Sequence, residues 1–229
     1  GMRTIRDIIE IKDVFINSDK IIPKSKILLD VYDFFKNLIV SEEEVSNENI
    51  DEDTDKDIDN EKKYFKKVYF GGINIIYALG GIHGSLKSSI VESNEEYIIK
   101  STDVVSFYPN IGIKNKLHPA HIPQDVFINI QESIFNRRQS IPKSEPANYI
   151  LKIALNAIYG MSNDEFSFLK DRHYTLAICI NGQLLLTTLF EEVINRIPNS
   201  KLIMCNTDGF EVLIPREYEN LYYEICKQW

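Results

Sequence analysis

The sequence lacks an apolar run that approaches the length needed to cross a bilayer, and no secretory leader opens it. It is also poor in cysteine: Cys179, Cys205 and Cys226 are an odd number without the spacing of a metal site. All three lie in apolar segments, so we expect free, buried thiols in a reducing cytoplasm. These absences argue against a disulfide-rich secreted domain and favour a cytoplasmic protein without a membrane partner.

Basic charge is nearly missing from one segment. Residues 41–60 contain ten acidic residues and one lysine, whereas the rest of the chain carries 25 basic and 24 acidic residues. The overall net charge of −8 therefore does not exclude nucleic acid as a partner. We expect 41–63 to be a solvated, disordered acidic insertion. It is not a calcium loop, because Lys56 and Lys62 stand where such a loop needs Gly and Glu.

The chain has 229 residues and 44% apolar content, enough for one substantial core or two small ones, and it contains no internal repeat. Helical apolar spacing predicts six helices, over 4–15, 26–39, 124–139, 148–160, 175–197 and 218–228. β-Branched and aromatic residues with paired glycines predict strands and tight turns over 68–93, and a further strand over 96–107. This order predicts an α+β fold, in which an antiparallel sheet packs on helices and a helical excursion interrupts the chain.

Two carboxylates stand in unusual places. In CNTDGFEVLIP (205–215), apolar runs flank a polar turn, which predicts a hairpin with Asp208 at its tip. Asp103 lies in the strand-like run TDVVSFYPNI (102–111), where burial of a lone charge would be costly. Neighbouring strands lie about 4.8 Å apart, so pairing of the two segments would let both carboxylates hold hard divalent cations.

A third segment, LKIALNAIYG (151–160), places Lys152, Asn156 and Tyr159 on one helical face. Taken alone, Lys152 is a solvated helix residue and Asp208 a turn residue. Taken together, the three segments favour a metal and phosphate site over those interpretations.

These segments resemble motifs A, B and C of family B DNA polymerases. DVVSFYP is similar to D-x-x-S-L-Y-P, KIALNAIYG to K-x-x-x-N-x-x-Y-G, and NTDG to D-T-D-S. The flanking segments SNDEFSFLKD and INGQLLL are similar to a phage-associated branch, which implies the cytoplasm of a bacterial host. The resemblance covers residues 66–215, and three motifs in the right order at compatible spacing indicate more than any one alone.

The resemblance implies a role for each matching residue. Asp103 and Asp208 would be catalytic and would ligate two Mg²⁺ ions, or Mn²⁺ as a substitute, with the backbone carbonyl of Val104 as a further ligand. The nucleotide would be bound by Tyr108, Arg138, Lys143, Lys152, Asn156 and Tyr159. Ser106, Asn206 and Thr207 would lie in the surrounding shell.

Two of these assignments carry open questions. The spacing from the arginine pair to Lys143 differs slightly from the family pattern, so either Arg137 or Arg138 could face the nucleotide. Asn206 replaces the usual first aspartate of motif C; it retains an oxygen but drops a charge, which weakens the site without removing it. Tyr108 would lie under the incoming sugar and leave no room for a 2′-hydroxyl.

The resemblance also implies a division of the chain into four parts. We expect an N-terminal helical segment with the acidic insertion over 1–65, and a first part of the palm with motif A over 66–123. Fingers helices with motif B would follow over 124–165, and a second part of the palm with motif C over 166–229. We expect the family's exonuclease and thumb domains to be absent.

The implied function is that of a palm and fingers fragment of a DNA-directed DNA polymerase, a nucleotidyltransferase of DNA replication acting on dNTP and primer-template DNA. The missing polymerase domains or a second polymerase chain would be further partners, and the isolated fragment would be weak or inactive. The alternative is a non-catalytic remnant or split-polymerase subunit that binds nucleic acid or a partner chain. Tyr108 and motif B disfavour a reverse transcriptase or RNA polymerase.

All four histidines lie outside these motifs, and three of them stand in segments where a site role has to be weighed. His118 and His121 have a metal-like spacing, but the intervening proline favours two surface side chains. His83, in a glycine-rich turn, is either an ordinary turn residue or a contact to a template strand.

Overall fold

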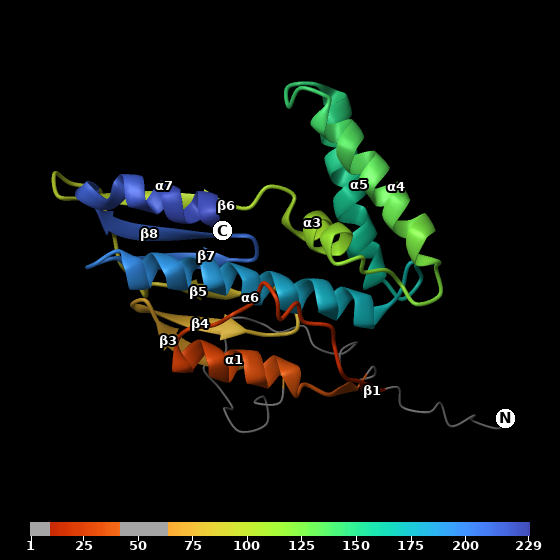
Figure 1. Ribbon diagram of the computed structural model, residues 1–229, viewed down its shortest axis with the longest axis horizontal. Coiled ribbons are helices and arrows are strands. Elements are labelled where there is room, and N and C mark those ends of the chain that lie inside the picture. Colours follow the sequence, from red (N-terminus) through yellow and green to blue (C-terminus); the bar gives the residue numbers. More distant parts are fainter. Residues whose placement is uncertain (1–9, 42–63) are drawn as a thin grey trace.

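The structure is a computed structural model that describes residues 10–41 and 64–229 (Figure 1). Within these ranges the chain combines helices with antiparallel sheets, so the predicted α+β class is confirmed. The predicted acidic insertion and the first half of the predicted helix over 4–15 lie outside the described residues.

The main sheet has six strands in the order β3-β4-β5-β7-β8-β6, and every neighbouring pair is antiparallel. Its strands are β3 (Lys66–Phe70), β4 (Ile73–Tyr77), β5 (His83–Ser85), β6 (Tyr97–Asp103), β7 (Lys201–Asn206) and β8 (Gly209–Pro215). A separate two-stranded ladder joins β1 (Glu10–Ile11) to β2 (Val40–Ser41). The hairpin predicted around Asp208 is β7–β8.

The helices predicted from residue 26 onward are found, and one further helix is added. They are α1 (Lys26–Lys36), α3 (Phe107–Lys114), α4 (Gln124–Gln139), α5 (Pro146–Ser162), α6 (Arg172–Arg196) and α7 (Glu219–Gln228), with a 3-10 turn η1 (Arg216–Tyr218) before α7. The addition is α3, which the sequence did not predict because Pro109 and β-branched residues stand in it. Pro109 is tolerated there, since it occupies the first turn and no helical donor is lost.

One face of the main sheet packs on α6. Alternate side chains of β4 and β8 are buried, as the period of a half-buried strand requires. The Phe210 ring of β8 meets Phe190 of α6 at 6.1 Å, and the Tyr77 hydroxyl pairs with Thr187 at 2.9 Å. Figure 1 shows α6 along this face, with α7 and α1 on either side of it. The core therefore lies between the sheet and α6.

Three buried polar side chains of α6 anchor neighbouring segments. Asn181 donates to the Phe15 carbonyl at 2.7 Å and accepts from the Asn17 amide at 2.8 Å. Gln183 bonds backbone groups of the 78–80 segment, and the Glu191 carboxylate accepts from two backbone amides at the start of α1. Each buried polar group is thus satisfied by backbone that it fixes in place.

Among the described helices, α6 alone is long and apolar enough to cross a membrane, with a mean hydropathy of 1.3, contrary to the expectation that no segment would be. However, 78% of this window is buried inside the molecule, and the core helix of a soluble protein passes the same test. We therefore describe α6 as a core helix.

Helices α4 and α5 form an antiparallel hairpin that stands away from the sheet (Figure 1). Pro146 begins α5, where the missing N–H removes no helical bond. Buried Asn148 joins the two helices, because its side-chain amide donates to the carbonyls of Arg138 at 3.0 Å and Ile141 at 2.7 Å. This hairpin is the predicted helical excursion.

Two sequence predictions are wrong in the described residues. The predicted strand over 96–107 ends at Asp103, because Ser106 adopts a left-handed φ of 52° and caps α3. The predicted helix over 4–15 is absent from its described part, where Glu10–Ile11 pairs with β2 instead. Tertiary pairing outweighs the helical spacing in so short a segment.

Candidate active site

The register of β6 and β8 brings the two predicted aspartates together. Asp103 pairs directly with Gly209, and the Val104 amide donates to the Asp208 carbonyl at 2.9 Å. Gly209 makes this approach possible, because an added Cβ would lie 2.5 Å from the Thr102 carbonyl oxygen. The prediction that residues 105 positions apart become neighbours is confirmed at the level of the backbone.

Neither carboxylate lies within the core: Asp103 ends β6, and Asp208 lies in the turn between β7 and β8. Asp103 and Asp208 are exposed, so the expectation that Asp103 would be a buried charge is wrong. It is the last residue of β6, an edge strand in which no residue is fully buried. Exposure leaves the oxygen atoms of both side chains accessible to solutes.

The turn between β7 and β8 is hydrogen bonded to the segment that connects β4 to β5. Thr207 has a φ of 36°, and its amide donates to the Ile82 carbonyl at 2.9 Å. Its hydroxyl donates to the side-chain oxygen of Asn206 at 3.0 Å. Gly81 leaves room for this hydroxyl, since an added Cβ would lie 2.8 Å from it. These contacts fix the residue that precedes Asp208.

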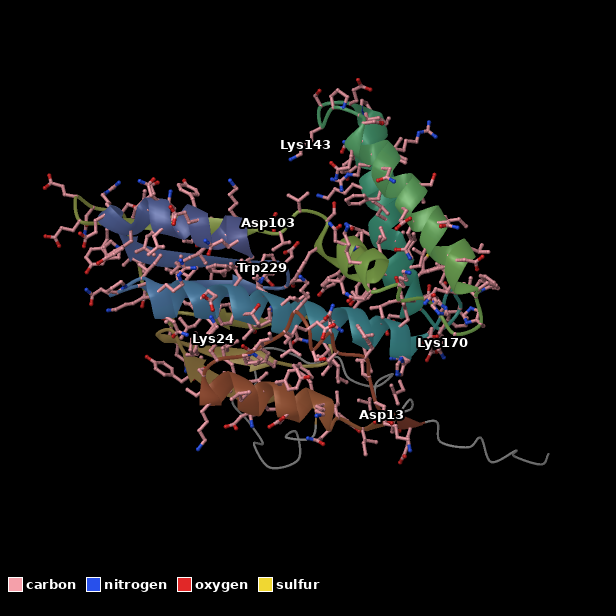
Figure 2. The ribbon with its side chains drawn as sticks, in the orientation of Figure 1. Asp13, Lys24, Asp103, Lys143, Lys170 and Trp229 are labelled. Atoms are coloured by element: carbon pink, nitrogen blue, oxygen red, sulfur yellow. The ribbon has the colours of Figure 1, made fainter. Side chains whose placement is uncertain are left out.

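The aspartates form one wall of a cavity of about 590 Å³ between the sheet end, α3 and the α4–α5 hairpin. Figure 2 shows Asp103 at the end of the sheet and Lys143 near the tip of the hairpin, on opposite sides. The predicted residues that line the cavity are Asp103, Val104, Ser106, Tyr108, Arg138, Lys143, Lys152, Asn156, Tyr159, Thr207 and Asp208. Of the predicted site, Asn206 does not line it.

Arg138, not Arg137, is the arginine that lines the cavity. Its Nη1 donates to the Ser106 Oγ at 2.6 Å, and its Nε donates to the Asn148 Oδ1 at 3.3 Å. Arg137 is exposed on α4 and does not line the cavity. The guanidinium group thus links the helical hairpin to the segment that follows Asp103.

Sequence reasoning missed five residues that line the cavity: Val105, Phe107, Pro109, Asn148 and Tyr149. Asn148 and Tyr149 could have been found, because they extend the Lys152 face of α5 by one turn. The remaining three stand inside motif A, next to its predicted site residues, and only the turn into α3 directs them toward the cavity.

Charge is divided between the two sides of the cavity. Partial burial first, and then the neighbouring Asp103 carboxylate, raise the pKa of Asp208, whereas a backbone hydrogen bond and Lys152 lower it. The opposite wall carries Arg138, Lys143 and Lys152. Two carboxylates facing three basic side chains suit an anionic ligand that is bound together with metal cations.

The histidines take no part in this arrangement. His118 Nδ1 lies 2.9 Å from the Ile122 carbonyl oxygen, and the His121 ring stacks edge-on against Phe168. In residues 10–41 and 64–229, no group of three or more His, Cys, Asp or Glu side chains could hold a metal ion. His83 pairs with Asn206 across β5 and β7, beside the turn and outside the cavity lining.

No family model matches the chain, and no curated protein matches it. One solved structure that resembles it is a DNA polymerase. It is the family B DNA polymerase from the hyperthermophilic archaeon Pyrobaculum calidifontis, with 16% sequence identity and a TM-score of 0.37. The match covers 61% of this chain and 23% of that polymerase, so the chain corresponds to less than a quarter of its length. At this level the likeness concerns the fold and carries no argument about activity.

Proposed function

We propose that this chain is the palm and fingers region of a DNA-directed DNA polymerase that transfers a nucleotide from dNTP to a primer 3′-hydroxyl. The observation that carries the proposal is the single cavity in which Asp103 and Asp208 face Arg138, Lys143 and Lys152. Motifs A, B and C supply Asp103, Lys152 and Asp208, while Arg138 and Lys143 come from the end of α4 and the turn before α5. Residues 66–123 and 166–229 would form the palm, and 124–165 the fingers.

The donor atoms of this wall fit a pair of divalent cations. Two exposed carboxylates and the Val104 carbonyl are hard oxygen donors, and the mutual repulsion that raises the pKa of Asp208 would be relieved by bound cations. Two Mg²⁺ ions, or Mn²⁺ in their place, would lower the pKa of the attacking hydroxyl and neutralise charge on the leaving pyrophosphate. Asp103, Asp208 and Val104 would hold them.

The opposite wall would bind the triphosphate. The Arg138 guanidinium offers a planar fork of donors, whereas Lys143 and Lys152 act as mobile point charges. Asn156 lies one helical turn beyond Lys152 and would donate its amide near the same phosphates. These groups would position the nucleotide and neutralise its charge, which are the main contributions of a protein to phosphoryl transfer.

Asn206 separates the proposal from its alternative, a non-catalytic remnant or a split-polymerase subunit that binds nucleic acid or a partner chain. Because Asn206 does not line the cavity, asparagine in place of the family's aspartate at this position removes no donor from the ligand set proposed above. This position favours the catalytic proposal. A phage-associated origin, a location in a bacterial host cytoplasm and a second polymerase chain as partner belong to the same proposal.

Nucleotide binding and primer extension test the proposal together. We expect dATP with Mg²⁺ or Mn²⁺ to raise the melting temperature of the chain, and Asp103→Asn or Asp208→Asn to abolish the effect. Asp125→Asn, an exposed aspartate at the start of α4, is the matched control and should retain it. In primer extension, with any partner chain added, Asp103→Ala and Asp208→Ala should each lose at least about a hundredfold in rate.

Extension that is unchanged in either alanine variant would rule out the assignment. Binding of primer-template DNA without any stabilisation by Mg²⁺, Mn²⁺ or dATP would instead support the non-catalytic remnant.

A further inference from the structure

A buried thiol lies directly behind the cavity. Cys179 of α6 is 1% exposed and does not line the cavity, yet its Sγ lies 2.8 Å from the hydroxyl of Tyr159. The Tyr108 hydroxyl lies near the same sulfur. One sulfur atom thus bonds the Tyr159 hydroxyl and lies beside that of Tyr108, and both tyrosines line the cavity.

Gly182, three residues along α6, supports the ring of Tyr108. An added Cβ at Gly182 would lie 3.0 Å from Tyr108 Cε1, closer than nine in ten contacts of real Cβ atoms. The same Cβ would lie 3.4 Å from Ile111 Cδ1 and 3.5 Å from Phe107 Cε1. Glycine therefore lets α3 approach α6 and lets the Tyr108 ring lie deeper than any other residue would allow.

The third contact of Tyr108 is with Tyr159. The two ring centroids lie 4.7 Å apart with an interplanar angle of 62°, an edge-on arrangement that favours one relative orientation. Tyr108 is therefore packed against Gly182 and against Tyr159, whose hydroxyl is bonded to Cys179. Its remaining side is the cavity.

The three polar groups remain neutral at physiological pH. Burial raises the pKa of Tyr108 and of Tyr159 far above the ordinary tyrosine value, and it raises the pKa of Cys179 to about 11. Both hydroxyl groups therefore keep their protons, and the Tyr159 hydroxyl can donate to the sulfur. Solvent does not reach the sulfur itself, because the Cys179 side chain is buried.

We propose that Cys179 and Gly182 are positioning residues that set the depth of Tyr108 and thereby the selection of deoxyribose over ribose triphosphates. The inference rests on the proposed function, in which Tyr108 underlies the incoming sugar. A side chain that excludes a single 2′-hydroxyl must be placed to within a fraction of an ångström. The α6 contacts provide that placement without touching the nucleotide.

Variants at the two positions should act in opposite directions. Cys179→Ala removes the sulfur that bonds the Tyr159 hydroxyl and lies beside that of Tyr108, so the Tyr108 ring can retreat. The ratio of ATP to dATP dissociation constants should then fall by about fivefold, the effect of one hydrogen bond of ordinary strength. Cys179→Ser keeps a hydrogen-bonding group and should restore most of the ratio. Gly182→Ala pushes the ring outward, so dATP itself should bind more weakly.

The matched control is Cys226→Ala, which removes a half-buried thiol of α7 that lies outside the cavity lining. Dissociation constants are measured with Mg²⁺ present, for dATP and ATP, on each variant. A ratio that is the same in Cys179→Ala as in the wild type would overturn the role in sugar selection.

A second measurement needs no nucleotide. With 3-fluorotyrosine at position 108, we expect the ¹⁹F resonance to move in Cys179→Ala and in Gly182→Ala, to return in Cys179→Ser, and to stay unchanged in Cys226→Ala. An unmoved resonance in the first two variants would overturn the positioning itself, and Gly182→Ala decides this point if Cys179→Ala does not fold. A wild type that binds no dATP would overturn the proposed function and the sugar selection, while the resonance would still show whether Cys179 holds Tyr108.

Discussion

At the scale of single residues, the candidate site depends on where each carboxylate lies and less on how many there are. Asp103 and Asp208 line the cavity, whereas Asn206, which pairs with His83 of β5, does not. The side chain of Asn206 accepts a hydrogen bond from Thr207, a role that a carboxylate would also fill. An amide at this position is therefore compatible with an intact metal-binding wall.

This placement predicts unequal effects of two conservative exchanges. Asn206→Asp should change the affinity for dATP with Mn²⁺ by no more than about fivefold, since exposed charge pairs contribute up to about 1 kcal/mol. Asp208→Asn should reduce the same affinity much more, because it removes a proposed ligand. Isothermal titration calorimetry measures both. An Asn206→Asp protein that binds far more tightly would indicate that Asn206 belongs to the ligand set.

The buried thiol of Cys205 predicts a loss of stability at alkaline pH. Burial raises the pKa of Cys205 from 9.0 to about 12. Between these values the unfolded chain releases a proton that the folded chain keeps, so the free energy of unfolding falls as pH rises, by up to about 1.4 kcal/mol per pH unit. Urea unfolding from pH 8 to 10.5 should show this slope, reduced by that amount in Cys205→Ala.

Other groups, including buried tyrosines, also contribute to the alkaline slope, so the comparison between the two proteins is the informative quantity. Equal slopes for wild type and Cys205→Ala would contradict the assignment.

At the scale of elements, α6 organises the site without lining it. In its INGQ stretch, the side chains of Asn181 and Gln183 fix the N-terminal segment and the β4–β5 connection, and Gly182 allows the close approach of α3. The connection held by Gln183 in turn supplies the Ile82 carbonyl that fixes Thr207. A chain of hydrogen bonds thus runs from the core helix to the residue before Asp208.

Breaking this series of hydrogen bonds should lower the stability of the folded protein and weaken nucleotide binding. Gln183→Leu leaves the backbone groups of Ala78 and Gly80 unsatisfied, which should lower the free energy of unfolding by about 1–3 kcal/mol. It should also weaken binding of dATP with Mg²⁺, because the Thr207 turn loses its support. Urea unfolding and calorimetry measure the two effects. Ser89→Ala, in an exposed loop, is the control; a Gln183→Leu protein that matched it in both respects would refute this account.

At the scale of the whole molecule, charge is strongly segregated. The 41–60 segment carries a net charge of −9, whereas the rest of the chain carries +1. The acidic segment should repel the phosphates of primer-template DNA, at long range and more strongly at low salt. The body of the protein is thus better suited to nucleic acid than the net charge of −8 suggests.

Replacing the ten acidic residues of 41–60 with Asn and Gln should therefore tighten DNA binding at low salt. The gain should shrink as ionic strength approaches about 1 M, where the screening length is about 3 Å. Fluorescence anisotropy with a labelled primer-template duplex measures this dependence. An affinity that does not change at low salt would show that the segment does not act on DNA through its charge.

The α+β class, most helix positions and the motif residues that line the cavity could be predicted from the sequence, because periodic apolar spacing and turn residues are local properties. The exposure of Asp103 at a strand end, the choice of Arg138 over Arg137 in the cavity lining and the existence of α3 follow from the three-dimensional arrangement alone. The same holds for the packing of Cys179 and Gly182 behind the two tyrosines. The physical reason is that strand register, helix facing and close approach depend on contacts between residues far apart in the chain, which no local pattern encodes.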